Sequence, residues 1–177
     1  MSPLHDSRDF IYSFAGLAGV VGLVLLLVQP LLAAGLLPGV RQLHARKWHQ
    51  RLGVAITLAV LLHVGGLYLT SPMDAMDALL LVSPTPFSVY GVIAMWGFLL
   101  TLVFVAVRRR IGLSAKAWRM AHTGMVGVVV GATLAHVMLI EGTMGAMSKL
   151  ILSVCVALAL AGVVLFVRLI RPNQRRN

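Results

Sequence analysis

The sequence predicts an all-α fold, a polytopic membrane bundle of about five transmembrane helices. Of its 177 residues, 59% are hydrophobic and only 11% are charged, and the mean hydropathy is +0.94. Soluble domains carry about 25% charged residues, so this chain lacks the polar surface that such a domain needs. Five runs poor in charge each approach the ~20 residues that a helix needs to cross a bilayer.

The runs place the spans at about residues 10–32, 49–69, 87–107, 120–140 and 150–169, all within one transmembrane domain, residues 1–177. The first run lacks a basic n-region and is too long for the apolar core of a signal peptide. Pro30 and Pro38 bracket its end, where a kink or an irregular exit is expected. The linker 70–86 contains MDALLLV, either a short interfacial helix or a loop on the membrane surface.

The charges between the runs predict the orientation. The net charge is +10, and all of the fifteen Lys and Arg except Arg8 and Lys149 fall in residues 41–51, 108–119 and 168–176. The five acids lie on the other side of the predicted membrane: Asp6, Asp9, Asp74, Asp77 and Glu141. The positive-inside rule therefore predicts an outer N-terminus and a cytoplasmic C-terminus. Because the basic clusters separate apolar runs, we expect the lipid bilayer as partner and no nucleic acid.

Two of the spans carry histidine pairs of equal spacing, His49 with His63 and His122 with His136. In each pair the histidines are fourteen positions apart, which is about 21 Å along a helix and within ~40° of one face. In the predicted topology both spans run from the cytoplasm outward. His49 and His122 then lie near the inner surface, and His63 and His136 near the outer one.

Each of the two levels therefore offers two imidazoles. One metal ion cannot bridge levels about 21 Å apart, because imidazole binds metals at about 2 Å. Two imidazoles suit a six-coordinate haem iron, and the absence of a CxxCH motif indicates non-covalent haem b. We therefore expect two haem b groups, ligated by the pairs His49/His122 and His63/His136. The alternative is that these histidines only bond neighbouring helices, which is common for a single histidine in a span.

The surroundings of the histidines add weaker predictions. Gly53, one turn after His49, would leave room for a macrocycle near the backbone. On the fourth span Val129 shares the histidine face, whereas small residues on the opposite face are expected to pack against another helix. Four basic residues could pair with haem propionates, although the positive-inside rule alone explains them: Arg46, Lys47, Arg51 and Arg119. We single out no catalytic side chain.

The segments WHQRLGVAITLAVLLHVGGLYL and WRMAHTGMVGVVVGATLAHVMLIEG resemble the two haem-bearing helices of the ferric reductase-like transmembrane domain. That family includes ferric reductases, NADPH oxidases and the haem subunit of a bacterial methionine sulfoxide reductase system. The resemblance covers about residues 10–170, and its most specific part is the two histidine pairs with Gly53 four residues after His49. It implies that His49, His63, His122 and His136 are the ligands of haem iron.

The chain departs from this family in two respects. It shows five spans where the family usually has six, and we expect the missing span to be the N-terminal one. It also has no Gly-rich nucleotide fingerprint. We therefore expect flavin only through a partner. The prediction is the membrane component of a ferric reductase-like oxidoreductase, in a bacterial inner membrane, that needs a separate partner.

Such a component would pass electrons from a cytoplasmic flavoprotein or a quinol donor to an unidentified acceptor or reductase on the outer side. Two alternatives stay open: a quinone-linked diheme cytochrome b, and a haem-free membrane subunit whose histidines serve only packing.

Overall fold

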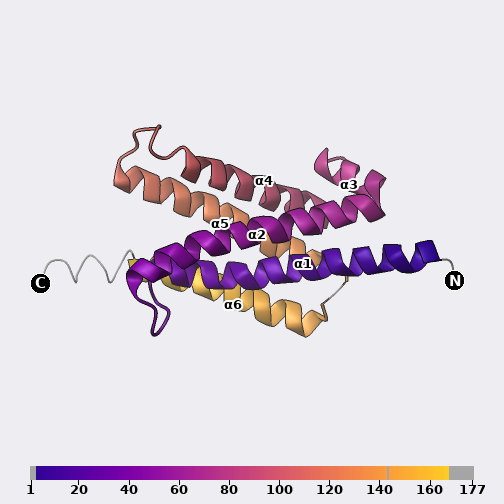
Figure 1. Cartoon of the computed structure of the whole chain (residues 1–177), viewed down its shortest axis with the longest axis horizontal. Coiled ribbons are helices and arrows are strands. Elements are labelled where there is room, and N and C mark those ends of the chain that lie inside the picture. Colours follow the sequence, from indigo (N-terminus) through magenta and orange to yellow (C-terminus); the bar gives the residue numbers. More distant parts are fainter. Residues whose placement is uncertain (1–2, 143, 168–177) are drawn as a thin grey trace, which may run out of the picture. The chain divides into compact units, whose positions relative to one another are not determined.

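The structure is a computed structural model that describes residues 3–142 and 144–167, with side chains from residue 9 onward. The regular elements of these residues are helices. Figure 1 shows them in chain order: α1 (Pro3–Ala34), α2 (Gln42–Thr70), α3 (Pro72–Leu79), α4 (Pro86–Ala106), α5 (Ala115–Leu139) and α6 (Ala146–Leu165). Within the described residues, five of them, all but α3, are long and apolar enough to cross a membrane. The predicted all-α class and the five spans are confirmed.

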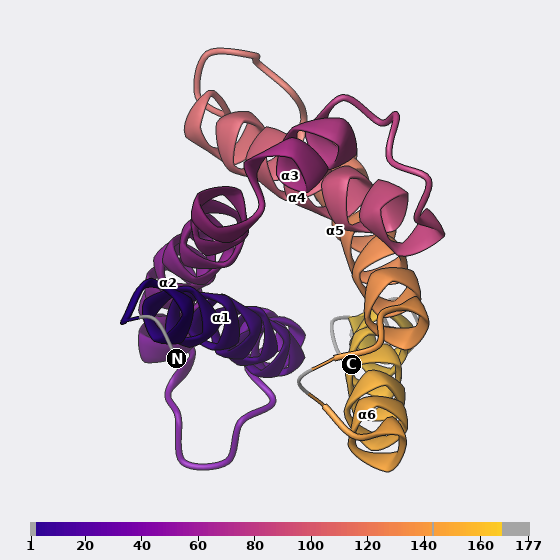
Figure 2. The same ribbon diagram turned by 90° about the vertical axis from the view of Figure 1, so that its right-hand side faces the viewer.

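Contacts divide the chain into two units, which are described separately. The first comprises Met1–Pro72 with Gly142–Asn177, and the second comprises Met73–Glu141. In the first unit α1 and α2 lie side by side and antiparallel, and α6 packs along α1 in the same direction as α1 (Figures 1 and 2). In the second unit α4 and α5 form another antiparallel pair.

Small residues allow α1 and α2 to approach closely. A Cβ added at Gly66 of α2 would lie 2.7 Å from the Cβ of Ala15 on α1. Farther along the same contact, a Cβ at Gly22 would lie 3.7 Å from that of Ala59. Membrane helices associate through such small residues because lipid tails provide no hydrophobic force to bring helices together.

The end of α1 lies about one turn after Pro30. The helix continues through Pro30 for about one more turn and ends at Ala34. Gly35 then adopts a left-handed conformation with φ of 70°, and the Leu36 N–H donates to Leu31 O at 3.0 Å. This is a Schellman closure, for which glycine is the preferred residue. The expected irregular exit is therefore present, one turn beyond Pro30.

The first basic segment, placed by the sequence in a loop, is largely helical. α2 begins at Gln42, so Arg46, Lys47 and Arg51 lie on its first turns. α5 likewise begins at Ala115, ahead of the span expected from residue 120. Arg, Lys, Gln and Ala all favour helix, and long basic side chains can extend to the membrane surface from a helix, so charge alone does not end these helices.

The second unit opens with the short helix α3, Pro72–Leu79. A short helix, one of the two predictions for MDALLLV, is thus present, but it begins earlier and ends at Leu79, within that motif. Its place at the membrane interface stays a prediction. α4 begins with Pro86 in its first turn, a position that tolerates the missing N–H. Ser114 caps α5, because its side chain accepts a hydrogen bond of 3.2 Å from the Ala117 N–H.

The small face of α5 is not the face that α4 contacts within the second unit. Gly124, Gly127 and Gly131 are exposed, and a Cβ at each would meet no atom within 4 Å among the described residues. α4 instead packs against the large side chains of α5: a Cβ at Gly97 would lie 3.1 Å from Val129. That the small face of α5 packs against another helix stays a prediction, because the helices of the other unit are described separately. Val129, expected to line the haem face, is buried.

The last predicted span, about residues 150–169, corresponds to α6, which begins earlier, at Ala146, and ends at Leu165. Residues 168 and 169 of that span lie outside the described residues, as does the basic tail at 168–176.

A pair of neighbouring glycines tests the close approach of α1 and α2. Gly66→Ala would place a methyl group 2.7 Å from Ala15, whereas a Cβ at Gly65 would meet no atom within 4 Å. Overpacking typically costs about 1–3 kcal/mol, so we expect Gly66→Ala to lower the thermal midpoint of the detergent-solubilised protein. Gly65→Ala is the control, for which we expect no loss because alanine favours helix over glycine. An equal loss in both variants would contradict the close contact.

Candidate functional site

The histidine pairs lie on two continuous helices. α2 carries His49 and His63, and α5 carries His122 and His136. With no break between the members of either pair, the fourteen residues correspond to about 21 Å along each helix axis. All four imidazoles are half-buried rather than exposed. The spacing within each helix that the sequence predicted is thus present.

His63 is held by the helix beside it. Its Nδ1 lies 2.8 Å from the backbone oxygen of Ala15 on α1. A carbonyl oxygen can only accept, so Nδ1 carries the hydrogen and donates it. In the neutral ring Nε2 then carries the lone pair that binds metals.

His136 has the same arrangement in the second unit. Its Nδ1 donates to the backbone oxygen of Phe87 on α4 at 2.7 Å. The Phe87 ring lies at an angle of 56° to the imidazole, with centroids 6.1 Å apart. The same tautomer follows, with the lone pair on Nε2.

His49 also bonds a backbone carbonyl of α1. Its Nδ1 lies 3.1 Å from Gln29 O. Gly53, one turn along α2, lies beside the side chain of the same residue, since a Cβ there would be 3.6 Å from Gln29 Nε2. Within the first unit, a Cβ at Gly53 would thus make only an ordinary contact with Gln29. Its predicted place beside a macrocycle stays a prediction.

His122 is positioned by an aromatic stack. The Trp118 ring, one turn earlier on α5, lies nearly parallel to the imidazole at 7°, with centroids 5.1 Å apart. Phe104 of α4 is in turn nearly parallel to Trp118, at 6.4 Å and 5°. The Arg108 guanidinium carbon lies 4.0 Å from the centre of the Trp118 ring, a cation–π contact. Rings stacked in this way restrict the rotation of the His122 imidazole.

The predicted propionate contacts are all exposed: Arg46, Lys47, Arg51 and Arg119. Arg51 lies over the ring of Trp48, with its guanidinium carbon 5.3 Å from the ring centre. Exposed basic side chains at helix ends suit both the membrane surface and an anionic group, so their role as propionate contacts stays a prediction.

The donor set fits haem iron better than a metal held by protein alone. Among the described residues, no group of three or more His, Cys, Asp or Glu side chains is placed to hold a metal ion. A haem needs only two axial ligands from the protein, because the porphyrin supplies the other four nitrogens. Metal-binding histidines usually donate their second N–H to a carbonyl or carboxylate, and His49, His63 and His136 show this bond.

The pairing across helices joins the two units. His49 and His63 belong to the first unit, and His122 and His136 to the second. The sets His49/His122 and His63/His136 therefore stay predictions.

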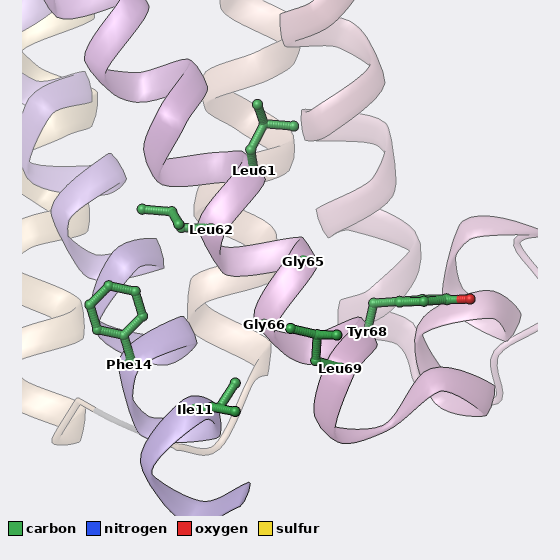
Figure 3. Close-up of a pocket in the computed structure, with 8 residues that line it drawn as sticks. All are labelled: Ile11, Phe14, Leu61, Leu62, Gly65, Gly66, Tyr68 and Leu69. Atoms are coloured by element: carbon green, nitrogen blue, oxygen red, sulfur yellow. The ribbon is translucent and has the colours of Figure 1, made fainter. Parts of the chain in front are cut away.

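A groove of about 470 Å³ lies between α1 and α2 in the first unit (Figure 3). Its lining is apolar except for one phenol: Ile11, Phe14, Leu61, Leu62, Gly65, Gly66, Tyr68 and Leu69. In Figure 3 the Tyr68 side chain extends away from Ile11 and Phe14, so its hydroxyl does not point toward them. Such a lining suits hydrocarbon and lacks the converging polar groups that orient a small polar ligand.

The sequence did not identify several residues that hold the histidines: Ala15, Gly19, Gln29, Phe87, Gly91 and Trp118. Backbone carbonyls carry no sequence signal, since every residue has one. Trp118 was recognisable, because an aromatic residue four positions before a histidine shares its helix face. Gly19 and Gly91 belonged to helices for which only the span was predicted.

Comparison with protein families gives one match. A family model described as ferric reductase like transmembrane component matches residues 18–133. The matched stretch contains His49, His63 and His122, and it ends shortly before His136. Neither the curated proteins nor the solved structures give a match to the chain.

Proposed function

Because the chain belongs to the ferric reductase like transmembrane component family, whose model matches more than half of it, we propose that it carries electrons across a bacterial inner membrane through two haem b groups. The family and the five apolar helices identify an integral membrane protein and a component of a membrane oxidoreductase. Domains of this family generally bind haem. The number of haems, their ligands and the direction of transfer are the proposal.

One observation carries the proposal. Three of the four histidines donate Nδ1–H to a backbone carbonyl of a neighbouring helix, which leaves the lone pair on Nε2. A histidine that served only packing could use either nitrogen as donor or acceptor. The same nitrogen donating in all three is the arrangement typical of metal ligands, because it fixes the ring and raises its basicity.

The chain's residues act at two levels. His49 and His122 would hold one iron near the cytoplasmic surface, and His63 and His136 would hold the other near the outer surface. The spacing of about 21 Å along each helix keeps the levels apart, and the apolar side chains of the spans exclude water from both. Haem iron held in this way would supply one-electron transfer between its ferric and ferrous states.

The basic side chains near the inner level have two proposed roles. Arg46, Lys47, Arg51 and Arg119 fix the orientation in the membrane, and they offer hydrogen bonds to propionates of the inner haem. The donor is a cytoplasmic flavoprotein or a membrane quinol, and any flavin belongs to that partner. The acceptor, an unidentified oxidant or reductase, lies on the outer side.

A reduced-minus-oxidised absorbance spectrum of the protein, purified after expression with haem supplied, tests the function. We expect b-type bands, because His ligation without a CxxCH motif holds haem non-covalently. The absence of such bands would favour the haem-free subunit. Mixing the oxidised protein with a quinol or with a reduced flavoprotein then identifies the donor, and reduction by quinol alone would favour the quinone-linked cytochrome.

Removal of one outer ligand tests the assignment of levels. We expect His63→Ala to lower the haem content from two groups to one per chain, with the inner haem spectrum largely retained, because His49 and His122 are untouched. His44→Ala is the matched control, since His44 lies exposed on the same helix and outside the pattern. Two haems retained in His63→Ala would rule out the proposed outer pair.

Cysteine labelling tests the orientation. Cys155, the single cysteine, is exposed on α6, so the background is Cys155→Ser. In that background we expect Arg109→Cys to react with a membrane-impermeant maleimide only in inside-out vesicles. Asp74→Cys should react only in right-side-out vesicles, because the basic segments are cytoplasmic. The reverse pattern would invert the proposed direction of electron transfer.

A further inference from the structure

The two outer histidines are held by the same local arrangement in two separate helix pairs. His63 Nδ1 donates to Ala15 O at 2.8 Å, and a Cβ added at Gly19 would lie 2.9 Å from that nitrogen. His136 Nδ1 donates to Phe87 O at 2.7 Å, and a Cβ at Gly91 would lie 2.8 Å from it. In both cases the glycine follows the accepting residue by four positions.

Helix geometry explains the interval of four. In an α-helix the N–H of residue i+4 donates to the carbonyl of residue i, so residue i+4 lies directly beyond that oxygen. Its Cα–Cβ bond tilts back toward the N-terminus of the helix, alongside the oxygen. A side chain there would occupy the space through which an imidazole reaches the second lone pair of the carbonyl. Glycine leaves this space open.

His49 provides an internal contrast. It donates to Gln29 O, and the residue four positions later is Ala33, which carries a Cβ. This bond is 3.1 Å long, whereas the bonds of the outer histidines are 2.8 and 2.7 Å. The shorter bonds occur at the two sites where glycine occupies the fourth position.

We propose that Gly19 and Gly91 are positioning residues for the outer haem ligands, each acting with the carbonyl four residues before it. This inference rests on the proposed function. The carbonyl fixes the Nδ1–H tautomer, and the glycine lets the ring approach until the bond is short. Because Nδ1 and Nε2 lie on different edges of the ring, holding Nδ1 against α1 or α4 directs Nε2 away from that helix.

A strong Nδ1–H bond also changes the electronic character of the ligand. Donation to a carbonyl raises the basicity of the imidazole, which stabilises ferric more than ferrous iron. The outer level, with this bond on both of its ligands, therefore acquires a lower reduction potential than the same ligands would give without it. A glycine whose Cβ would meet no atom, such as Gly127, would not affect the potential.

The test compares Gly19→Ala and Gly91→Ala in the purified full-length protein, with electron paramagnetic resonance and a redox titration as readouts. We expect either methyl group to push the imidazole back and lengthen its bond to the carbonyl, as in the 3.1 Å bond of His49, where Ala33 occupies the fourth position. The low-spin signal that His63→Ala removes should shift or disappear, and its midpoint potential should rise where the signal persists. The inner haem of the same molecules should keep its signal, which reports that the protein is folded.

Two glycines serve as matched controls. A Cβ at Gly22 on α1 would make only an ordinary contact of 3.7 Å with Ala59, and a Cβ at Gly127 on α5 would meet no atom within 4 Å. Gly22→Ala and Gly127→Ala should keep both signals and both potentials.

Three results would overturn the inference, and one of them would also overturn the proposed function. An unchanged outer haem in both alanine variants, with two haems in the wild type, would overturn only the positioning role. Loss of both haems together would also overturn it, because that indicates failure of the helix pair rather than a displaced ligand. Wild-type protein without haem b would overturn the proposed function and this inference with it.

Discussion

Imidazole groups inside a membrane span must satisfy their N–H where water is absent. An unpaired polar group in such surroundings costs several kcal/mol. In this protein His49 and His63 donate to carbonyls of α1, and His136 donates to a carbonyl of α4. These bonds link each helix that carries histidines to the helix before it, so the ligand geometry depends on how closely the helices of each pair approach. Threonine hydroxyls in the spans are instead paired within their own helix. Each donates to the carbonyl four residues earlier: Thr57, Thr70, Thr101 and Thr133.

The close approach follows from where the small residues lie. On α1, Ala15 meets Gly66, and Gly22 meets Ala59. On α4, Gly97 receives Val129. Since lipid does not drive helices together, these contacts depend on van der Waals packing and on the histidine bonds themselves. The packing that brings α1 to α2, or α4 to α5, therefore also sets the orientation of the imidazoles, which connects helix association to the proposed haem chemistry.

The sequence predicted the elements of this arrangement better than their contacts. The five spans followed from charge-free length, and the histidine spacing followed from helix periodicity, because both are local properties of the chain. The ends of the helices were predicted less accurately: α2 and α5 begin within segments whose basic residues suggested loops.

Contacts between helices could not be derived from the sequence, since the partner of His63 is a backbone oxygen with no sequence signal. The sequence also did not indicate which face of α5 meets α4, where Gly91 and Gly97 approach His136 and Val129. The pairing of His49 with His122, and of His63 with His136, stays a prediction because it joins the two units.

We propose that four histidines of one chain bind two haems. The most direct measurement is the number of haem b groups per polypeptide, from the pyridine haemochrome of the purified protein, combined with its electron paramagnetic resonance spectrum in the oxidised state. We expect two haems per chain, both low-spin with two imidazole ligands. A single haem, or a high-spin signal that shows an open coordination site at full occupancy, would contradict it.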